Sequence, residues 1–222
     1  AHTLRRIFEE GPSRTPEVLS VTSGKGGVGK TSIVVNMGIL LASRGKKVIV
    51  LDADLGLANV DVMLGIAPKL TIKHVLDGQC PIEDIVLTGP AGVKIIPASS
   101  GIQELADLNP EQQISLVNAL DHFDGDFDYL IIDTGAGISR NVMYFNAASQ
   151  RVIVVATAEP TSITDAYALI KVLRKHYGIK RFDLIVNNVT SKVEGDHVAE
   201  KLIMVWDRFL GDVALEMLGS IP

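Results

Sequence analysis

The stretch Gly24-Lys25-Gly26-Gly27-Val28-Gly29-Lys30-Thr31 decides the fold of this chain. It follows the apolar run Val18–Val21 and precedes a helical pattern of apolar residues that begins at Ile33. In such a loop the glycines let consecutive backbone N–H groups turn toward phosphates, and the start of the following helix favours an anion. A strand, a glycine-rich loop and a helix in this order predict a phosphate-binding loop. The alternative is a glycine-rich turn with two solvated lysines, but such a turn would not need a strand before it and a helix after it.

The two lysines of the loop are expected to differ in role. Lys30 is placed to reach the β- and γ-phosphates, and the Thr31 hydroxyl is placed to bind Mg²⁺. Lys25 is poorly placed for the nucleotide of its own subunit, but a long cation there can reach the phosphates on a facing subunit. The hypothesis is a dimer controlled by nucleotide. The predicted nucleotide-binding residues of this region are Gly24, Lys25, Gly26, Gly27, Val28, Gly29, Lys30, Thr31 and Ser32.

Two carboxylates, Asp52 and Asp54, come directly after the apolar run Val48–Leu51. At the end of a strand we expect them to point in different directions. One carboxylate then binds Mg²⁺ and its waters, and the other orients the attacking water. Acidic residues also cap helices, which is the alternative explanation of the pair.

A third carboxylate, Asp133, follows the apolar run Tyr129–Ile132. An apolar strand that ends in Asp is the Walker-B arrangement, in which the carboxylate holds the water shell of Mg²⁺. Gly135 and Gly137 add mobility, so this loop can bring a backbone N–H to the γ-phosphate and release it after hydrolysis. A simple turn from strand to helix is the alternative.

Asn187 and Asn188 follow another apolar run, Phe182–Val186. An asparagine amide offers a donor and an acceptor, which matches the N6 and N7 edge of adenine. Paired asparagines also form turns, so both interpretations stay open.

Short apolar runs alternate with helical patterns along the whole chain. Runs that are apolar on both faces fit buried strands of a parallel sheet covered by helices. We therefore predict an α/β fold with a mostly parallel sheet flanked by helices on both faces, and ligands at the carboxyl ends of its strands. The predicted strands after the first are Val48–Leu51, Val93–Ile96, Tyr129–Ile132, Arg151–Ala156, Phe182–Val186 and Ala214–Gly219.

The composition limits the possible functions. The chain has 222 residues, of which 47% are hydrophobic, and a formal net charge of −5. This charge argues against a broad surface for nucleic acid. The one cysteine, Cys80, excludes a disulfide framework and a Cys-ligated metal site within one chain. No apolar stretch approaches membrane-spanning length and no signal peptide is evident, so a cytoplasmic location is expected.

The chain is expected to divide into an arm, a linker and one large domain. Residues 1–10 form the arm, residues 11–16 a linker rich in Gly and Pro, and residues 17–222 the domain with the phosphate-binding loop. Leu4, Ile7 and Phe8 lie at helical spacing in the arm. Both ends look cut, because the chain starts at Ala1 rather than Met and stops directly after a strand-like run. A carboxyl-terminal tail is expected to be missing.

These motifs together resemble the MinD/ParA family of deviant-Walker ATPases over roughly residues 17–222. The resemblance rests on Lys25 with Lys30, on the run Asp52–Asp61, on Asp133 and on Asn187. Within the family the chain looks like the FlhG group, also called FleN or YlxH, whose members regulate flagellar number and placement. The stretches that carry this finer resemblance are Gly56–Gly65, Pro97–Gly101 and Asp133–Ile138.

The resemblance implies an ATPase that binds ATP or ADP with Mg²⁺, dimerises with ATP and hydrolyses slowly to reset a switch that controls flagella. It assigns Lys25 to the phosphates of the partner subunit, Lys30 to those of its own subunit, Asp54 to the attacking water and Asn187 to adenine. Lys25, Lys30 and Asp54 are thus the catalytic candidates, and Thr31, Asp52 and Asp133 the candidates for the metal. This chain departs from many relatives at two positions: it has Gly135 where they have Pro, and Asn188 where they have Arg.

The resemblance also names partners. The opening Ala1–Arg5 matches the end of a D-Q-A-x-x-L-R motif, which implies docking of the arm on the GTPase FlhF. A flagellar transcription activator or a C-ring protein is a further candidate. Membrane contact, at the inner face of the cell membrane, is expected only through the missing carboxyl-terminal helix. The alternatives are a MinD-like regulator of the division site, a ParA-type partition protein, which would need a basic surface, and a metal-cofactor assembly ATPase, which would need a cysteine pair.

One basic cluster remains outside these motifs. It surrounds the end of a helix predicted to start near Ser162 and consists of Lys171, Arg174, Lys175, His176, Lys180 and Arg181. Cations at that end complement the helix dipole and face water. The functional alternative is a docking surface for an acidic protein partner; a DNA site is not expected, because no aromatic residues are interleaved to stack bases.

Overall fold

The computed structural model describes residues 16–55, 60–98, 108–121, 123, 126–209 and 213–222. The predicted arm, the linker up to residue 15 and parts of the FlhG-like stretches, residues 56–59 and 99–101, lie outside the described residues. The chain divides into two compact units. One contains Val35–Ile131 with the residues before Leu19, and the other contains Leu19–Val34 with Ile132–Pro222.

The first unit is built on β2 (Val48–Ala53), β3 (Leu87–Thr88) and β4 (Lys94–Ile96), in the order β3-β4-β2. Strands β2 and β4 are parallel, whereas β3 is antiparallel to β4. All six residues of β2 are buried. The short helices of this unit are α3 (Val60–Leu64), α4 (Ile72–Leu76), α6 (Pro110–Asp121) and the 3-10 turns η1 (Ile82–Ile85) and η2 (Pro90–Gly92).

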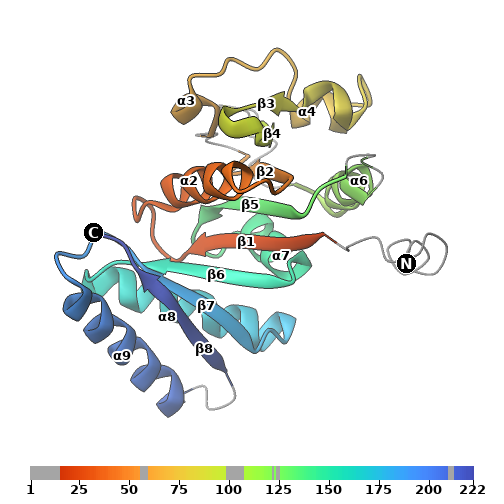
Figure 1. The fold of residues 1–222 in the computed structure, drawn as a ribbon. Helices are drawn as coiled ribbons and strands as arrows, with labels where there is room; N and C mark the ends of the chain where they lie inside the picture. The colour runs from red at the N-terminus through yellow and green to blue at the C-terminus, as the bar shows by residue number, and fades with distance from the viewer. Residues whose placement is uncertain (1–15, 56–59, 99–107, 122, 124–125, 210–212) are drawn as a thin grey trace, which may run out of the picture. The chain divides into compact units, whose positions relative to one another are not determined.

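The second unit contains most of β1 (Glu17–Ser23) and all of β6 (Arg151–Ala156), β7 (Arg181–Val186) and β8 (Ala214–Ser220), in the order β1-β6-β7-β8. These pairs are all parallel. Figure 1 shows β6, β7 and β8 side by side. The helices are α7 (Arg140–Ala148), α8 (Pro160–Tyr177) and α9 (Lys192–Phe209), and α2 (Lys30–Ser43) begins in this unit.

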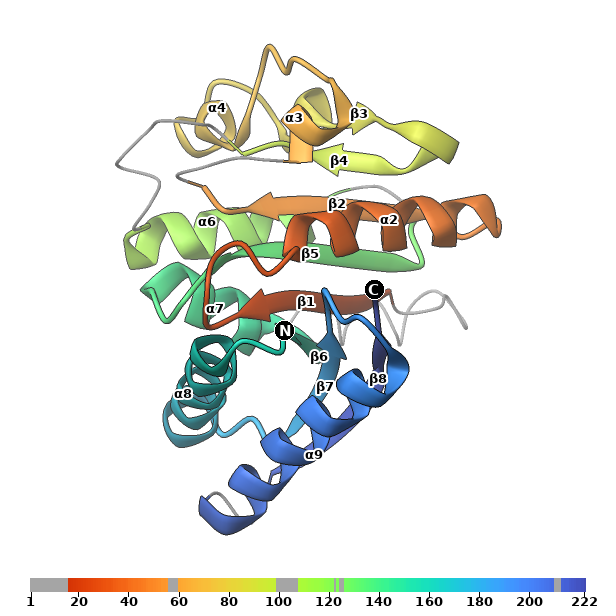
Figure 2. The same ribbon diagram turned by 90° about the vertical axis from the view of Figure 1, so that its left-hand side faces the viewer.

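One apolar core holds the second unit together. Residues of α7, α8 and α9 pack with those of β6 and β7, and Trp206 on α9 is 1% exposed within this cluster. The turned view in Figure 2 shows α9 running along β7 and β8. Strands β6 and β7 are buried from their second residue to their last. This burial explains why their sequences are apolar on both faces rather than alternating.

The predicted α/β class with a mostly parallel sheet is confirmed. Every strand run named from the sequence is a strand, with ends that differ by a few residues. The edge strand β3 was not predicted, because two residues are too few to show a period. The helix after the loop is also confirmed as α2, although Leu40 on it is 53% exposed.

The largest difference concerns β5 (Tyr129–Ala136), which was expected to end before Asp133. The strand continues for three residues past Asp133 because two hydrogen bonds tie this segment to β1. The Thr134 hydroxyl donates to the Val21 carbonyl at 3.0 Å, and the Gly137 N–H donates to the Ser23 carbonyl at 2.9 Å. Asp133 therefore lies within a strand rather than at its end.

Candidate nucleotide-binding site

The glycine-rich loop runs from the end of β1 to the start of α2. Gly27 and Gly29 have φ angles of 76° and 91°, which side chains rarely adopt. Gly24 is required for a different reason: a Cβ there would lie 2.1 Å from the Asp165 carbonyl oxygen on α8. The loop therefore combines left-handed turns with close packing on a neighbouring helix, as the phosphate-loop prediction requires.

Lys30 lies at the base of this loop. It is the first residue of α2, is 9% exposed, and its Nζ donates to the Ser23 Oγ at 3.0 Å. The Ser23 hydroxyl in turn donates to the Lys25 carbonyl at 2.6 Å. Thr31 follows on the same helix turn and is partly exposed. The Lys30 ammonium is thus held against the loop backbone, at the helix start where an anion is favoured.

Lys25 lies on the outer side of the loop, in a different environment. Its Nζ forms an ion pair with Glu159, the residue before α8, and donates to the Thr161 Oγ1 at 3.0 Å. The side chains of Lys25 and Glu159 are 36% and 63% exposed. In the single chain, Lys25 therefore reaches a carboxylate of its own subunit, a contact that the sequence did not reveal.

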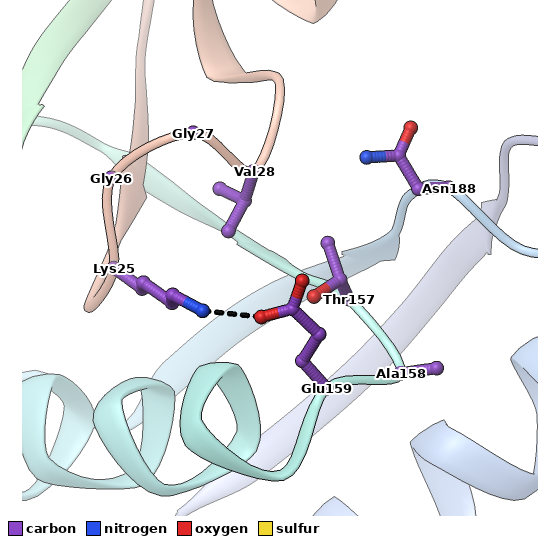
Figure 3. Close-up of a pocket in the computed structure, with 8 residues that line it drawn as sticks. All are labelled: Lys25, Gly26, Gly27, Val28, Thr157, Ala158, Glu159 and Asn188. Atoms are coloured by element: carbon purple, nitrogen blue, oxygen red, sulfur yellow. Dashed lines mark hydrogen bonds and ion pairs between the residues drawn. The ribbon is translucent and has the colours of Figure 1, made fainter.

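A pocket adjoins this ion pair, as Figure 3 shows. Thr157 is 6% exposed and its Oγ1 has no hydrogen-bond partner among the described residues. The pocket is lined by Lys25, Gly26, Gly27, Val28, Thr157, Ala158, Glu159 and Asn188.

Asn187 holds the loop from the side of β7. Its Nδ2 donates to the Val28 carbonyl at 2.8 Å, and its side chain is so close that a Cβ at Gly29 would lie 2.2 Å from Nδ2. Asn187 is 7% exposed. The sequence suggested adenine recognition, but it did not suggest this clamp on the loop backbone. The neighbouring Asn188 adopts a φ of 55°, which asparagine tolerates, and lines the pocket.

Asp133 is buried at 1% exposure in β5, the strand next to β1 in the second unit. A carboxylate oxygen and the Thr31 hydroxyl are hard oxygen ligands of the kind that Mg²⁺ accepts. Among the described residues, no group of three or more His, Cys, Asp and Glu side chains is arranged to hold a metal. Mg²⁺ commonly binds proteins through one or two oxygens together with phosphates and water.

Asp52 and Asp54 belong to the first unit. Asp52 is 1% exposed, and its two carboxylate oxygens accept N–H groups of Asp54 at 3.2 Å and Val60 at 3.1 Å. Asp54 is partly exposed just after β2. Asp52 therefore holds the backbone that carries Asp54, much as an acidic residue that caps a helix accepts backbone N–H groups. Asp54 is the more accessible of the two carboxylates.

Comparison with known proteins places these features in a family. A protein-family model described as "AAA domain" matches residues 16–185. The antiactivator FleN of Pseudomonas aeruginosa is 50% identical over 93% of this chain and 73% of its own length. The flagellum site-determining protein YlxH of Helicobacter pylori is 38% identical over 91% of this chain and 68% of its own length.

A solved structure agrees with the sequence relatives. The septum site-determining protein MinD of Pyrococcus horikoshii, complexed with Mg-ADP, superposes with a TM-score of 0.75 and 25% identity, covering 94% of this chain and 82% of its own. Among the described residues, no helix has the length and apolar character needed to cross a membrane. The loop, the fold and the relatives agree, and the chain belongs to the FleN and MinD family of P-loop ATPases.

Proposed function

We propose that this protein is an ATP-dependent dimerisation switch that regulates the number or placement of flagella. The observation that carries the proposal is the contrast between the two lysines of the loop. Lys30 is buried at the base of the loop, whereas Lys25 lies outside it and is partly exposed. One lysine is thus placed for the nucleotide of its own subunit, and the other is accessible to a second subunit.

Within one subunit, the residues divide the work of binding and hydrolysis. The loop N–H groups and Lys30 bind the phosphates, while Thr31 and Asp133 hold Mg²⁺ with its water shell. Mg²⁺ held there would supply positive charge to offset the charge that develops on the phosphates. Asp54 orients the attacking water, and Asp52 supports it by accepting the N–H groups of Asp54 and Val60. Asn187 holds the loop through its hydrogen bond to the Val28 carbonyl, and its side-chain amide also binds adenine.

Between subunits, Lys25 supplies the contact that makes dimerisation depend on ATP. Its present partner, Glu159, is 63% exposed, and such ion pairs contribute only about 0–1 kcal/mol. The phosphates of ATP carry more charge than one carboxylate and attract the ammonium more strongly. Exchange of Glu159 for phosphates of the facing subunit therefore costs little.

The flagellar role rests on the relatives. YlxH is named a flagellum site-determining protein, which points to control of flagella, and FleN is named an antiactivator, which points to a regulatory role. The similarity to MinD supports division-site positioning as the second candidate. A ParA-type role in DNA partition is the third candidate and has less support, since the net charge of −5 disfavours binding to DNA.

The partners follow from the same assignment. Residues 1–10 would serve as the arm that docks on an FlhF-type GTPase, with residues 11–16 as its linker and residues 17–222 as the ATPase domain. A Leu4→Asp substitution in a peptide of the arm should abolish its binding to FlhF, because it places a charge in an apolar contact. A flagellar transcription activator or a C-ring protein is the proposed target, and a carboxyl-terminal helix would supply any contact with the cell membrane.

Complementation tests the proposed function. A flagellated bacterium that lacks its own FleN should regain its normal flagellar number when it carries this protein, but not when it carries the Lys30→Ala variant. The expression level of both proteins is the control. Restored division-site placement in a strain without MinD, together with no effect on flagella, would instead favour the second candidate.

A further inference from the structure

The carboxyl-terminal end of α8 carries the strongest concentration of positive charge that the nucleotide site does not use. Residues 171–181 contain five of the 21 Lys and Arg residues and none of the 26 Asp and Glu residues. We name this the basic surface. It consists of Lys171, Arg174, Lys175, His176, Lys180 and Arg181.

The fold keeps these cations together at the carboxyl-terminal end of α8. Lys171, Arg174 and Lys175 have the spacing of neighbours on a helix face. Gly178 ends the helix with a φ of 72°, and its N–H donates to carbonyls of the last turn. The chain reverses there, so that Lys180 and Arg181 follow beside that turn at the start of β7. The opposite face of α8 is buried through Ala166, Leu169, Ile170 and Leu173.

Three cations of the basic surface are not neutralised by neighbouring carboxylates. In the described part of the chain, no ion pair involves Lys171, Lys175 or Arg181, and all three are exposed. The acid on the adjoining strand, Asp183, pairs with Arg151 at 2.8 Å. Lys171 lies 6.0 Å from the ring centre of Tyr167, a contact that leaves its charge in place.

The helix dipole does not account for so many cations. A helix end carries about half an elementary charge, and its effect fades within the last turn. Five Lys and Arg residues exceed that need several-fold. Because like charges repel, such a concentration weakens the fold slightly unless a negative ligand binds it.

We propose that the basic surface docks an acidic peptide segment of a protein partner. All acidic residues of the chain lie outside this stretch, and the net charge is −5. A long polyanion such as duplex DNA or an anionic membrane would extend beyond the surface and meet that negative charge. A short acidic segment stays within about 8 Å, the screening distance at physiological salt, of the cations. Tyr177, 45% exposed, adds an apolar contact for a peptide side chain.

The docking surface and the nucleotide pocket lie at opposite ends of α8. Glu159, which lines the pocket, precedes the helix, and the helix has 18 residues, so the two ends are about 27 Å apart. A bound acidic segment would therefore leave the pocket open. Binding should not require ATP, and its test does not depend on the proposed switch.

Fluorescence anisotropy with a short labelled peptide of alternating Glu and Ser tests the proposal. The wild-type protein should bind this peptide with or without ATP, and the binding should weaken at high salt. A variant with Lys171→Glu, Lys175→Glu and Arg181→Glu should bind at least about tenfold more weakly. The matched control reverses three exposed cations elsewhere, Arg44, Lys69 and Lys201, to Glu and should stay within about twofold.

Three results would overturn the proposal. The first is no peptide binding by the wild-type protein. The second is an equal loss in the control variant, which would show that net charge rather than the basic surface controls binding. The third is tighter binding of duplex DNA, or of vesicles of phosphatidylserine and phosphatidylcholine, that depends on the same three residues. Circular dichroism of both variants checks that they fold.

Discussion

The inner and outer sides of the phosphate-binding loop differ in how firmly they are held. On the inner side, Lys30 and Asn187 are buried and make hydrogen bonds to Ser23 and to the Val28 carbonyl. On the outer side, Lys25 is tied to the exposed Glu159. We therefore propose that the inner side is preorganised to bind a nucleotide, whereas the outer side exchanges its partner at little cost. Binding and dimerisation are therefore expected to respond separately to mutation.

The largest effect is expected on the inner side, from Lys30→Ala. The change removes the buried ammonium that we propose binds the phosphates, and loss of such a charged partner costs about 2–5 kcal/mol. Calorimetric titration with ATP and Mg²⁺ should show this loss of affinity. Lys25→Ala is the matched control and should retain most of the affinity. Equal losses in both variants would remove the distinction between the two sides.

The Asp54→Ala variant should separate turnover from binding. If Asp54 orients the attacking water, its loss should slow hydrolysis by roughly 100-fold while ATP still binds. The dimer should then accumulate with ATP. Single-turnover assays measure the rate, and unchanged turnover would transfer the role to another residue. Asp52→Asn is less informative, because Asp52 also accepts two backbone N–H groups and the variant would disturb the turn.

A smaller effect is expected from Asn187→Ala, which takes the donor from the Val28 carbonyl. An unpaired buried group costs about 1–3 kcal/mol, so the loop should lose order and ATP affinity should fall about tenfold. Gln79→Ala, which removes an exposed amide that does not line the pocket, is the control. Calorimetry compares the two variants. Asn187 would have no clamping role if its variant bound ATP like the wild type.

The smallest effect is expected on the outer side, from Glu159→Gln. Without the carboxylate, Lys25 is released, and dimerisation should occur at a lower ATP concentration. Since the ion pair is exposed, the shift should be about fivefold or less. Light scattering during an ATP titration measures it. Glu200→Gln, which removes an exposed carboxylate near His197, should shift nothing, and a shift of the opposite sign for Glu159→Gln would contradict the exchange.

The contrast also shows what could be predicted from the sequence. The loop was predictable because its glycines, lysines and flanking runs are contiguous, and the buried strands were predictable because β2, β6 and β7 are apolar on both faces. The contacts from Lys25 to Glu159 and from Asn187 to Val28 were not, since they join residues 134 and 159 positions apart. Only the strand order brings those segments together. The extension of β5 past Asp133 depends on β1 in the same way.

The central claim is that Lys25 acts between subunits and Lys30 within one. Light scattering of the purified protein and its Lys25→Ala variant, each with ATP and Mg²⁺, tests it most directly, provided that calorimetry confirms ATP binding by both. The wild-type protein should double its mass with ATP, and the Lys25→Ala variant should bind ATP yet stay monomeric. A Lys25→Ala variant that dimerised with ATP like the wild type would contradict the claim.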